Sequence, residues 1–359
     1  MSIHPESSPV PHDFPKIALV LMNMGTPDAP TIAAARRFLK RSLKDARIVE
    51  GSFGERWLSR NFFVLLYRSI KLAKRYAAIW KRDGSPLLAH TEKQAKKLAR
   101  RLEAREHDVH VVHTMRYGAP QIKQTLTQLS QEGYERILIL PVYPQYSDAT
   151  TGAALDAVAE HVIGGRNMPE LRFVRDFHDH EAYIGALVEL VRTYWETNGR
   201  PDKLLMSFRG IQMDRAERGT AYLDRCRRTA TMLAERLGLV EGQYESAFQS
   251  CLGPGEWMAP HTTVAMEKLA KEGVSRVDVV FPGFVADCLE TLGEIDIDAR
   301  QKFLNAGGKD LRVLPCLNDS EPWLRALTEI AEQHLLGWPT MQKSSEVGQP
   351  SSSRRVTWR

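Results

Sequence analysis

The chain has 359 residues, of which 43% are hydrophobic and 26% charged, with a formal net charge of +5 and a pI near 8.9. This length exceeds that of a typical single core and predicts two domains of ordinary size. The mildly basic balance fits an acidic small-molecule substrate or contact with an anionic surface. Because the sequence carries no basic stripe interleaved with aromatics, no helix-turn-helix and no RNP motif, we expect no nucleic-acid partner.

The two ends of the chain, residues 1–15 and 340–359, are polar and are expected to be flexible. The amino-terminal stretch lacks an apolar signal region, and no apolar run approaches the roughly 18 residues of a membrane span. The four scattered cysteines fit a reducing compartment, and we expect a cytoplasmic protein. The cysteines are Cys226, Cys251, Cys288 and Cys316. Because no two of them form a C-x-x-C pair, we expect neither a zinc knuckle nor an iron–sulfur cluster held by a local motif.

Between these ends, apolar runs typical of strands alternate with amphipathic helical patterns, such as those over 94–103 and 222–237. This alternation predicts an α/β protein with parallel sheets and helices on both faces. The expected strands are 17–22, 109–113, 136–142, 172–176, 203–208, 243–248, 276–281 and 310–315.

The chain also repeats itself at a distance of 140 residues. Ala119-Pro120 recurs as Ala259-Pro260, and Glu132-Gly133 recurs as Glu272-Gly273. In both copies a helix is expected to end at Glu-Gly, where glycine suits the helix C-cap, and a buried strand follows. We therefore expect two homologous α/β domains.

We place the two domains at residues 16–160 and 161–335. The first carries an insertion at about 35–80, in which large apolar and basic side chains recur at roughly helical spacing. Two interpretations stay open for this segment. It is a helical cover over a ligand site, or an amphipathic lip that contacts a membrane surface and takes up an apolar ligand.

Ligands of open parallel sheets bind beyond the carboxyl ends of the strands. The loop after the first expected strand has a single glycine, Gly25, followed by Thr26-Pro27. It contains neither G-x-G-x-x-G nor G-x-x-x-x-G-K, which argues against a dinucleotide cofactor and against a nucleotide triphosphate.

The most informative loop segment contains three acidic residues, Asp287, Glu290 and Glu294. If this segment opens an α-helix, the three lie at i, i+3 and i+7 and share one face. They form either an exposed acidic helix start favoured by the helix dipole or a site of hard oxygen ligands for a divalent metal and for proton transfer.

Seven motifs, taken together and in their order, resemble those of the ferrochelatase family, and the resemblance covers about residues 16–335. The motifs are MNMGTPDAP (22–30), GSPL (84–87), MRYG (115–118), LPVYPQYSDATTG (140–152), SFRG (207–210), GPGEWMAP (253–260) and PGFVADCLETLGEI (282–295). The resemblance implies two chelatase-type domains with a porphyrin cleft between them. It also implies insertion of Fe²⁺ into protoporphyrin IX to give protohaem, by a lyase of haem biosynthesis whose iron is a substrate.

The resemblance also assigns roles to residues. Glu290 matches a glutamate that faces the porphyrin and serves as acid/base and metal ligand, and Asp287 and Glu294 continue its acidic line. Aromatic and apolar side chains suit the walls around a flat ring, and arginine suits the propionates. The ring-lining candidates are Met24, Tyr117, Tyr143 and Trp257; the propionate candidates are Arg116, Ser147 and, equally explained as an exposed basic face, Arg68 and Lys71.

One position departs from the family pattern, because Arg209, which we place among the substrate-binding residues, stands where the family has a histidine opposite the glutamate. A guanidinium stays charged, has no lone pair to offer and repels Fe²⁺. If Arg209 points inward, it pairs with Glu290 and competes with the metal; if it points outward, the site has lost a ligand. A second departure is Cys251, where the family more usually has an arginine.

Three functions are compatible with this sequence. The first is a working ferrochelatase, which we expect. The second is a paralogue that binds porphyrin or haem without inserting metal, and the third is a chelatase for another metal or tetrapyrrole. All three keep the same pocket and differ in turnover.

Overall fold

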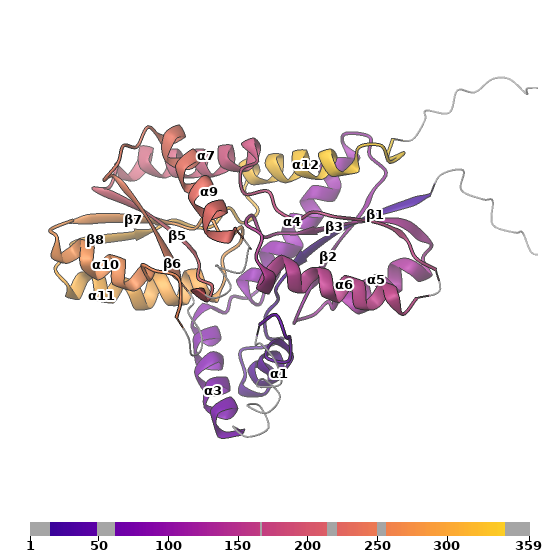
Figure 1. The fold of residues 1–359 in the computed structure, drawn as a ribbon, viewed down its shortest axis with the longest axis horizontal. Helices are drawn as coiled ribbons and strands as arrows, with labels where there is room; N and C mark the ends of the chain where they lie inside the picture. Colours follow the sequence, from indigo (N-terminus) through magenta and orange to yellow (C-terminus); the bar gives the residue numbers. More distant parts are fainter. Residues whose placement is uncertain (1–14, 49–61, 166, 214–220, 250–255, 342–359) are drawn as a thin grey trace, which may run out of the picture.

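The computed structural model describes residues 15–48, 62–165, 167–213, 221–249 and 256–341. Within them, eight strands form two four-stranded parallel sheets, ordered β2-β1-β3-β4 and β6-β5-β7-β8 (Figure 1). All eight predicted strands and the predicted fold class are confirmed. The strands are β1 (Lys16–Asn23), β2 (His110–Met115), β3 (Tyr134–Pro141), β4 (Glu170–Phe173), β5 (Lys203–Arg209), β6 (Tyr244–Gln249), β7 (Arg276–Val280) and β8 (Asp310–Val313).

Two of the inner strands, β1 and β5, are apolar along almost their whole length. In β1 every residue after Lys16 is buried, and in β5 every residue from Leu204 to Phe208 is buried. A parallel strand covered by helices on both faces has no solvent side, which is why these strands read as continuous apolar runs.

Helices cover both faces of each sheet. In Figure 1, α5 and α6 lie below the first sheet, α10 and α11 lie below the second, and α7 and α12 lie above; α4 packs against β1 and β2, and α9 against β6. The helix predicted over 222–237 is confirmed as α9, whereas the one predicted from 94 begins earlier, at Pro86. The helices are α1 (Ile32–Ser42), α3 (Phe62–Ile79), α4 (Pro86–Glu103), α5 (Ile122–Gln131), α6 (Ala153–Ile163), α7 (Glu181–Asn198), α9 (Tyr222–Leu237), α10 (Thr262–Lys271), α11 (Arg300–Asn305) and α12 (Glu321–Leu335), with two π-helical segments, η1 (Asp148–Gly152) and η3 (Leu289–Ala299).

The 140-residue repeat of the sequence is a repeat of structure. The helices α5 and α10, the strands β4 and β8, and the first residues of α7 and α12 are each 140 residues apart. Equivalent backbone hydrogen bonds recur, since Met115 N donates to Pro120 O at 2.7 Å and Phe248 N donates to Pro260 O at 2.9 Å. Each sheet, with the helices that lie in the chain between its first and its last strand, is therefore one copy of the same unit; we call each copy a half.

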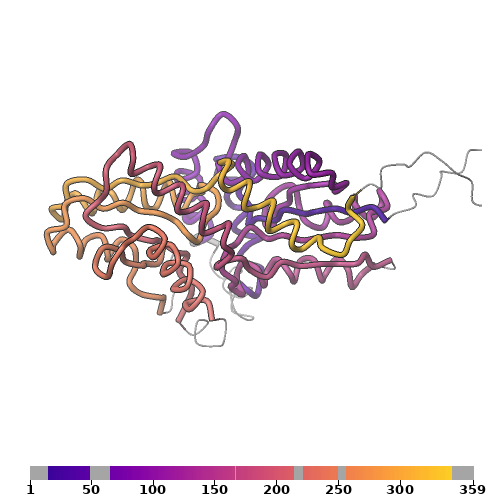
Figure 2. Tube along the Cα trace, turned by 90° about the horizontal axis from the view of Figure 1, so that it is seen from above, coloured from indigo at the N-terminus to yellow at the C-terminus, as the bar shows by residue number. Residues whose placement is uncertain are grey.

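The two halves exchange their last long helices. The helix α7 follows the first sheet but bonds to the second, where Trp195 Nε1 donates to Asp278 Oδ2 at 2.8 Å. The helix α12, yellow in Figure 2, follows the second sheet but lies over the first, where Arg172 Nη1 donates to His334 O at 2.7 Å. The boundary expected between residues 160 and 161 does not separate the sheets, because β4 lies beyond it and pairs with β3.

The predicted tail begins later than residue 340, because Thr340 is buried. Its carbonyl oxygen accepts from Asp108 N at 2.6 Å, and its hydroxyl lies 2.7 Å from His107 Nδ1. The remainder of the two ends that we expect to be flexible, 1–14 and 342–359, falls outside the described residues. None of the helices in the described part of the chain is long and apolar enough to cross a membrane.

The described part of the insertion contains the helices α1 and α3. The helices α1 and α3 extend away from both sheets at the junction of the two halves (Figure 1). The helix α3 reaches η3 of the second half, where Arg75 Nη2 donates to Asp298 Oδ2 at 2.5 Å. This placement favours a cover over the junction.

Candidate active site

The predicted site residues come from loops at one edge of each sheet. Met24 follows β1, Tyr117 follows β2 and Tyr143 follows β3, while Arg209 ends β5 and Glu290 follows β7. Because all strands of each sheet are parallel, their carboxyl ends meet at one edge, as expected for an α/β ligand site. The two edges face each other at the junction of the halves, since Arg209 of the second half contacts Met24 of the first.

Arg209 points inward, toward Glu290. Its Nη1 lies 3.9 Å from Glu290 Oε1, and the two side chains are 24% and 27% exposed. The same Nη1 lies 3.5 Å from the Met24 sulfur, to which it donates. The Arg209 carbonyl oxygen accepts from Tyr222 Oη at 2.7 Å, which fixes the end of β5. Of the two orientations considered for Arg209, the structure has the one that pairs it with Glu290.

Glu290 lies in the first turn of the π-helical segment η3. The segment starts after Cys288, whose backbone is extended at φ −147° and whose N–H donates to Thr291 Oγ1 at 3.0 Å. Asp287 therefore precedes the helix, and the α-helical face predicted for Asp287, Glu290 and Glu294 does not form as expected. Glu290 and the half-buried Glu294 lie about one turn apart, since a π-helix has i→i+5 hydrogen bonds.

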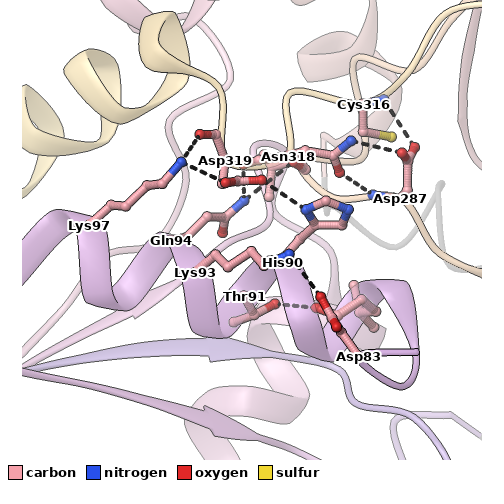
Figure 3. A network of polar contacts seen from close by, with 12 residues as sticks. Asp83, His90, Thr91, Lys93, Gln94, Lys97, Asp287, Cys316, Asn318 and Asp319 are labelled. Atoms are coloured by element: carbon pink, nitrogen blue, oxygen red, sulfur yellow. Dashed lines mark hydrogen bonds and ion pairs between the residues drawn. The ribbon is translucent and has the colours of Figure 1, made fainter. Parts of the chain in front are cut away.

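Asp287 is 6% exposed, and its carboxylate is turned toward the loop after β8 (Figure 3). Its Oδ1 accepts from Cys316 N at 3.0 Å and its Oδ2 accepts from Asn318 Nδ2 at 2.7 Å. The structure thus places Asp287 next to Glu290 in the chain but directs its carboxylate into a separate network.

Arg116 and Tyr117 share a carboxylate that the sequence interpretation missed. Asp45 Oδ2 accepts from Arg116 Nη2 and from Tyr117 Oη, each at 2.7 Å, and its side chain is 6% exposed. Burial and the bond to Asp45 raise the pKa of Tyr117. One sequence feature could have pointed to Asp45: it is the only acidic residue in the basic stretch 29–48.

Two further tyrosines lie close to the charged pair. Burial raises the pKa of Tyr143, while Arg209 and Arg116 oppose the rise. Burial, and then the negative charge of Glu290, raise the pKa of Tyr76, which comes from α3. Both phenols are therefore neutral at physiological pH and present flat, uncharged rings. Tyr76 was not among the predicted residues, because only the packing of α3 against η3 brings it near.

The other predicted site residues differ in their burial and in their contacts. Ser147 is buried with its hydroxyl 2.6 Å from Thr150 Oγ1, within its own loop. Trp257 is half-buried and pairs as an isolated bridge with Gln212. On α3, Arg68 is half-buried and Lys71 is exposed. Cys251 lies outside the described residues, and within those residues no group of three or more His, Cys, Asp and Glu is arranged to hold a metal ion.

Comparison with known proteins gives consistent results. The family model described as Ferrochelatase matches residues 16–335. A protein named Ferrochelatase from Herminiimonas arsenicoxydans is 48% identical over 99% of this chain and 97% of its own length. Another of that name, from Janthinobacterium sp. (strain Marseille), is 50% identical over 95% of this chain and 93% of its own.

Among solved structures, SirB from Bacillus subtilis with Fe³⁺ is similar, with a TM-score of 0.52 and 11% identity over 89% of this chain and 95% of that one. The sirohydrochlorin chelatase SirB from Bacillus subtilis subspecies spizizenii in complex with cobalt has a TM-score of 0.51 and 8% identity, with the same coverage. At these identities the two likenesses show the fold.

Proposed function

Because the chain belongs to the ferrochelatase family, we propose that it inserts Fe²⁺ into protoporphyrin IX and gives protohaem at the junction of its two halves. The observation that carries this proposal is that Arg209 of the second half lies beside both Glu290 of its own half and Met24 of the first half. Iron is a substrate of this reaction, and no tightly bound cofactor is part of the proposal.

The walls of the junction suit a flat apolar ring. We assign ring contact to Met24, Tyr117, Tyr143 and Trp257, as the sequence predicts, and we add Tyr76 from α3. Neutral aromatic rings bury a macrocycle without desolvating a charge.

Propionate binding falls to Arg116 in this proposal. One of its nitrogens already donates to Asp45, but its buried Nε has no acceptor within the described part of the chain. An entering carboxylate would supply that acceptor and form a charge-assisted hydrogen bond. Ser147 is a weaker candidate, because its hydroxyl must first leave Thr150.

Two pyrrole N–H protons must leave the ring as Fe²⁺ binds its four nitrogens. We assign acceptance of both protons, one after the other, to the Glu290 carboxylate, which passes each to Glu294, about one turn along η3, and from there to solvent. Arg209, which in this proposal stands where the family has a histidine, accepts no proton. Its fixed positive charge stabilises a deprotonated pyrrole nitrogen and at the same time repels the incoming cation.

The same geometry favours a second candidate function, the binding of porphyrin or haem without metal insertion. A guanidinium 3.9 Å from Glu290 partly neutralises the carboxylate that has to accept the proton and meet the metal. If this effect dominates, the ring binds and the metal does not enter.

The test is anaerobic incubation with protoporphyrin IX and Fe²⁺, followed by absorbance, with Zn²⁺ and Co²⁺ in parallel. Glu290→Gln is compared with Glu160→Gln, an exposed glutamate on α6 that serves as the matched control. We expect the unsubstituted chain and Glu160→Gln to form haem and Glu290→Gln to be about 100-fold slower with unchanged porphyrin binding. Binding without conversion in every variant would establish the second candidate instead, and turnover with Zn²⁺ or Co²⁺ alone would indicate a chelatase for another metal.

The cellular setting is part of the same proposal. We place the enzyme in the cytoplasm, on the strength of its few scattered cysteines. Peripheral contact with a membrane would use α3, where Tyr67 is 68% exposed and Lys71 is exposed beside the site.

A further inference from the structure

Asp287 and the side-chain amide of Asn318 are joined by two hydrogen bonds. Asn318 Nδ2 donates to Asp287 Oδ2 at 2.7 Å, and Asp287 N donates to Asn318 Oδ1 at 2.9 Å. The other oxygen, Oδ1, accepts from Cys316 N at 3.0 Å (Figure 3). Both carboxylate oxygens are therefore engaged in holding the loop after β8 against the residue that precedes η3.

Asn318 has a left-handed backbone, with φ at +50°, a conformation that asparagine adopts more readily than most other non-glycine residues. Its backbone is held on both sides: the Asn318 N–H donates to Val285 O at 2.8 Å, and its carbonyl oxygen accepts from Gln94 Nε2 at 2.5 Å. The loop after β8 is therefore fixed at this residue.

The contacts that fix Asn318 continue into the first half. Lys97 Nζ donates to Asp319 Oδ2 at 2.6 Å, and His90 Nδ1 lies 3.1 Å from Asp319 Oδ1. With Gln94 these residues lie at i, i+4 and i+7 on one face of α4. One helix of the first half thus holds the loop to which Asp287 is bonded.

Asp287 is in turn coupled to Glu290 by a short and rigid connection. One residue later, Cys288 N donates to Thr291 Oγ1 at 3.0 Å, and Thr291 is fully buried. Glu290 lies within this closed turn, so a displacement of Asp287 displaces the Glu290 carboxylate relative to Arg209.

The internal repeat provides a comparison within the same chain. Residues 140 positions before Asp287, Glu290 and Asn318 are Ser147, Thr150 and His178. In that copy Ser147 Oγ bonds to Thr150 Oγ1 at 2.6 Å. The Asp–Asn pair therefore occurs only in the half that carries the reactive carboxylate, so the fold of a half does not require it.

We propose that Asp287 and Asn318 are positioning residues for Glu290, and that Asp287 contributes through its hydrogen bonds and not as a base or a metal ligand. This inference rests on the proposed function, because its kinetic test measures metal insertion. It changes the role predicted for Asp287 and gives Asn318 a role that the motifs do not indicate.

The test exchanges the two side chains. Asp287→Asn leaves one amide facing another, and Asn318→Asp sets two carboxylates against each other. In the double variant, the amide introduced at 287 donates to the carboxylate introduced at 318, and both backbone N–H groups keep an acceptor. We expect each single variant to lower kcat about 10- to 100-fold with little change in the KM for porphyrin, and the double variant to recover most of it. A double variant as slow as Asp287→Asn would show that the carboxylate itself is needed and would overturn the proposal.

Two further measurements distinguish an effect on the position of Glu290 from a general loss of stability, and test the inference independently of metal insertion. Asp202→Asn is the control, because the exposed Asp202 carboxylate likewise accepts two hydrogen bonds, in this case both from backbone N–H groups, at the amino-terminal end of β5; it should lower Tm and leave kcat unchanged. Amide hydrogen exchange over residues 287–292 should accelerate in each single variant and return in the double variant. Exchange needs no turnover, so it tests the coupling even if the unsubstituted chain inserts no metal, and unchanged exchange in the single variants would contradict it.

Discussion

The guanidinium of Arg209 lies 3.9 Å from the carboxylate of Glu290, and each side chain is about three-quarters buried. At this separation the attraction amounts to about 1 kcal/mol in bulk water and about 4 kcal/mol at the effective dielectric of a protein surface. A cation that binds Glu290 must overcome part of this attraction and also approach a fixed positive charge. We therefore expect the pair to control how readily a metal ion reaches the carboxylate.

Asp45 holds the first-half side of the site together. Asp45→Asn replaces a buried carboxylate that accepts from Arg116 and Tyr117 and leaves the guanidinium without its countercharge. We expect a loss of about 2–3 kcal/mol in the free energy of unfolding and weaker porphyrin binding. Urea unfolding and fluorescence titration measure the two effects, and unchanged porphyrin affinity would argue against a role of Arg116 and Tyr117 in the site.

Gly25 allows the loops after β1 and β2 to touch. A Cβ at Gly25 would lie 2.7 Å from Gly118 N, and the residue has φ at +104°. Gly242 is a matched control, since its φ is +86° but a Cβ there meets nothing within 4 Å. We expect Gly25→Ala to cost about 1–3 kcal/mol more than Gly242→Ala in urea unfolding, because it adds overpacking to the backbone strain that both share. Equal losses would mean that the loops are free to separate.

The contact between α4 and the loop after β8 should depend on pH. Burial would raise the pKa of Asp319, but Lys97 and His90 outweigh it, so the pKa lies below its ordinary value. Folding therefore favours the charged form. The contribution to stability is present at neutral pH and declines as pH falls through the ordinary carboxyl range, below about 4. The difference in unfolding free energy between the unsubstituted chain and Asp319→Asn should shrink toward zero on acidification, and a difference that grows there would contradict this assignment.

The strands and the duplication could be predicted from the sequence for a physical reason. Parallel strands buried on both faces, such as β1, have to be continuously apolar, and this signal is local. The equivalence of Pro120 and Pro260 was visible because the two copies keep the same spacing. The domain boundary was not predictable in this way, because α7 and α12 exchange partners between the halves through contacts that leave no local pattern.

The site was predictable only where a motif names a residue. Glu290 and Arg209 were expected to face each other if Arg209 points inward, and they do. Asp45, Tyr76 and Asn318 were missed, because each acquires its place from a partner that is distant in sequence. The helix phase of η3 was also missed, since a π-helical turn changes which acidic residues share a face.

The role of Arg209 can be measured through the initial rate of Fe²⁺ insertion as a function of Fe²⁺ concentration, in the unsubstituted chain and in Arg209→His. We expect the KM for Fe²⁺ to fall about tenfold in Arg209→His while the KM for porphyrin is unchanged, because removal of the fixed charge recovers about 1.4 kcal/mol of the attraction between the metal and Glu290. The same dependence on Fe²⁺ in both proteins would mean that Arg209 does not control access of the metal to Glu290.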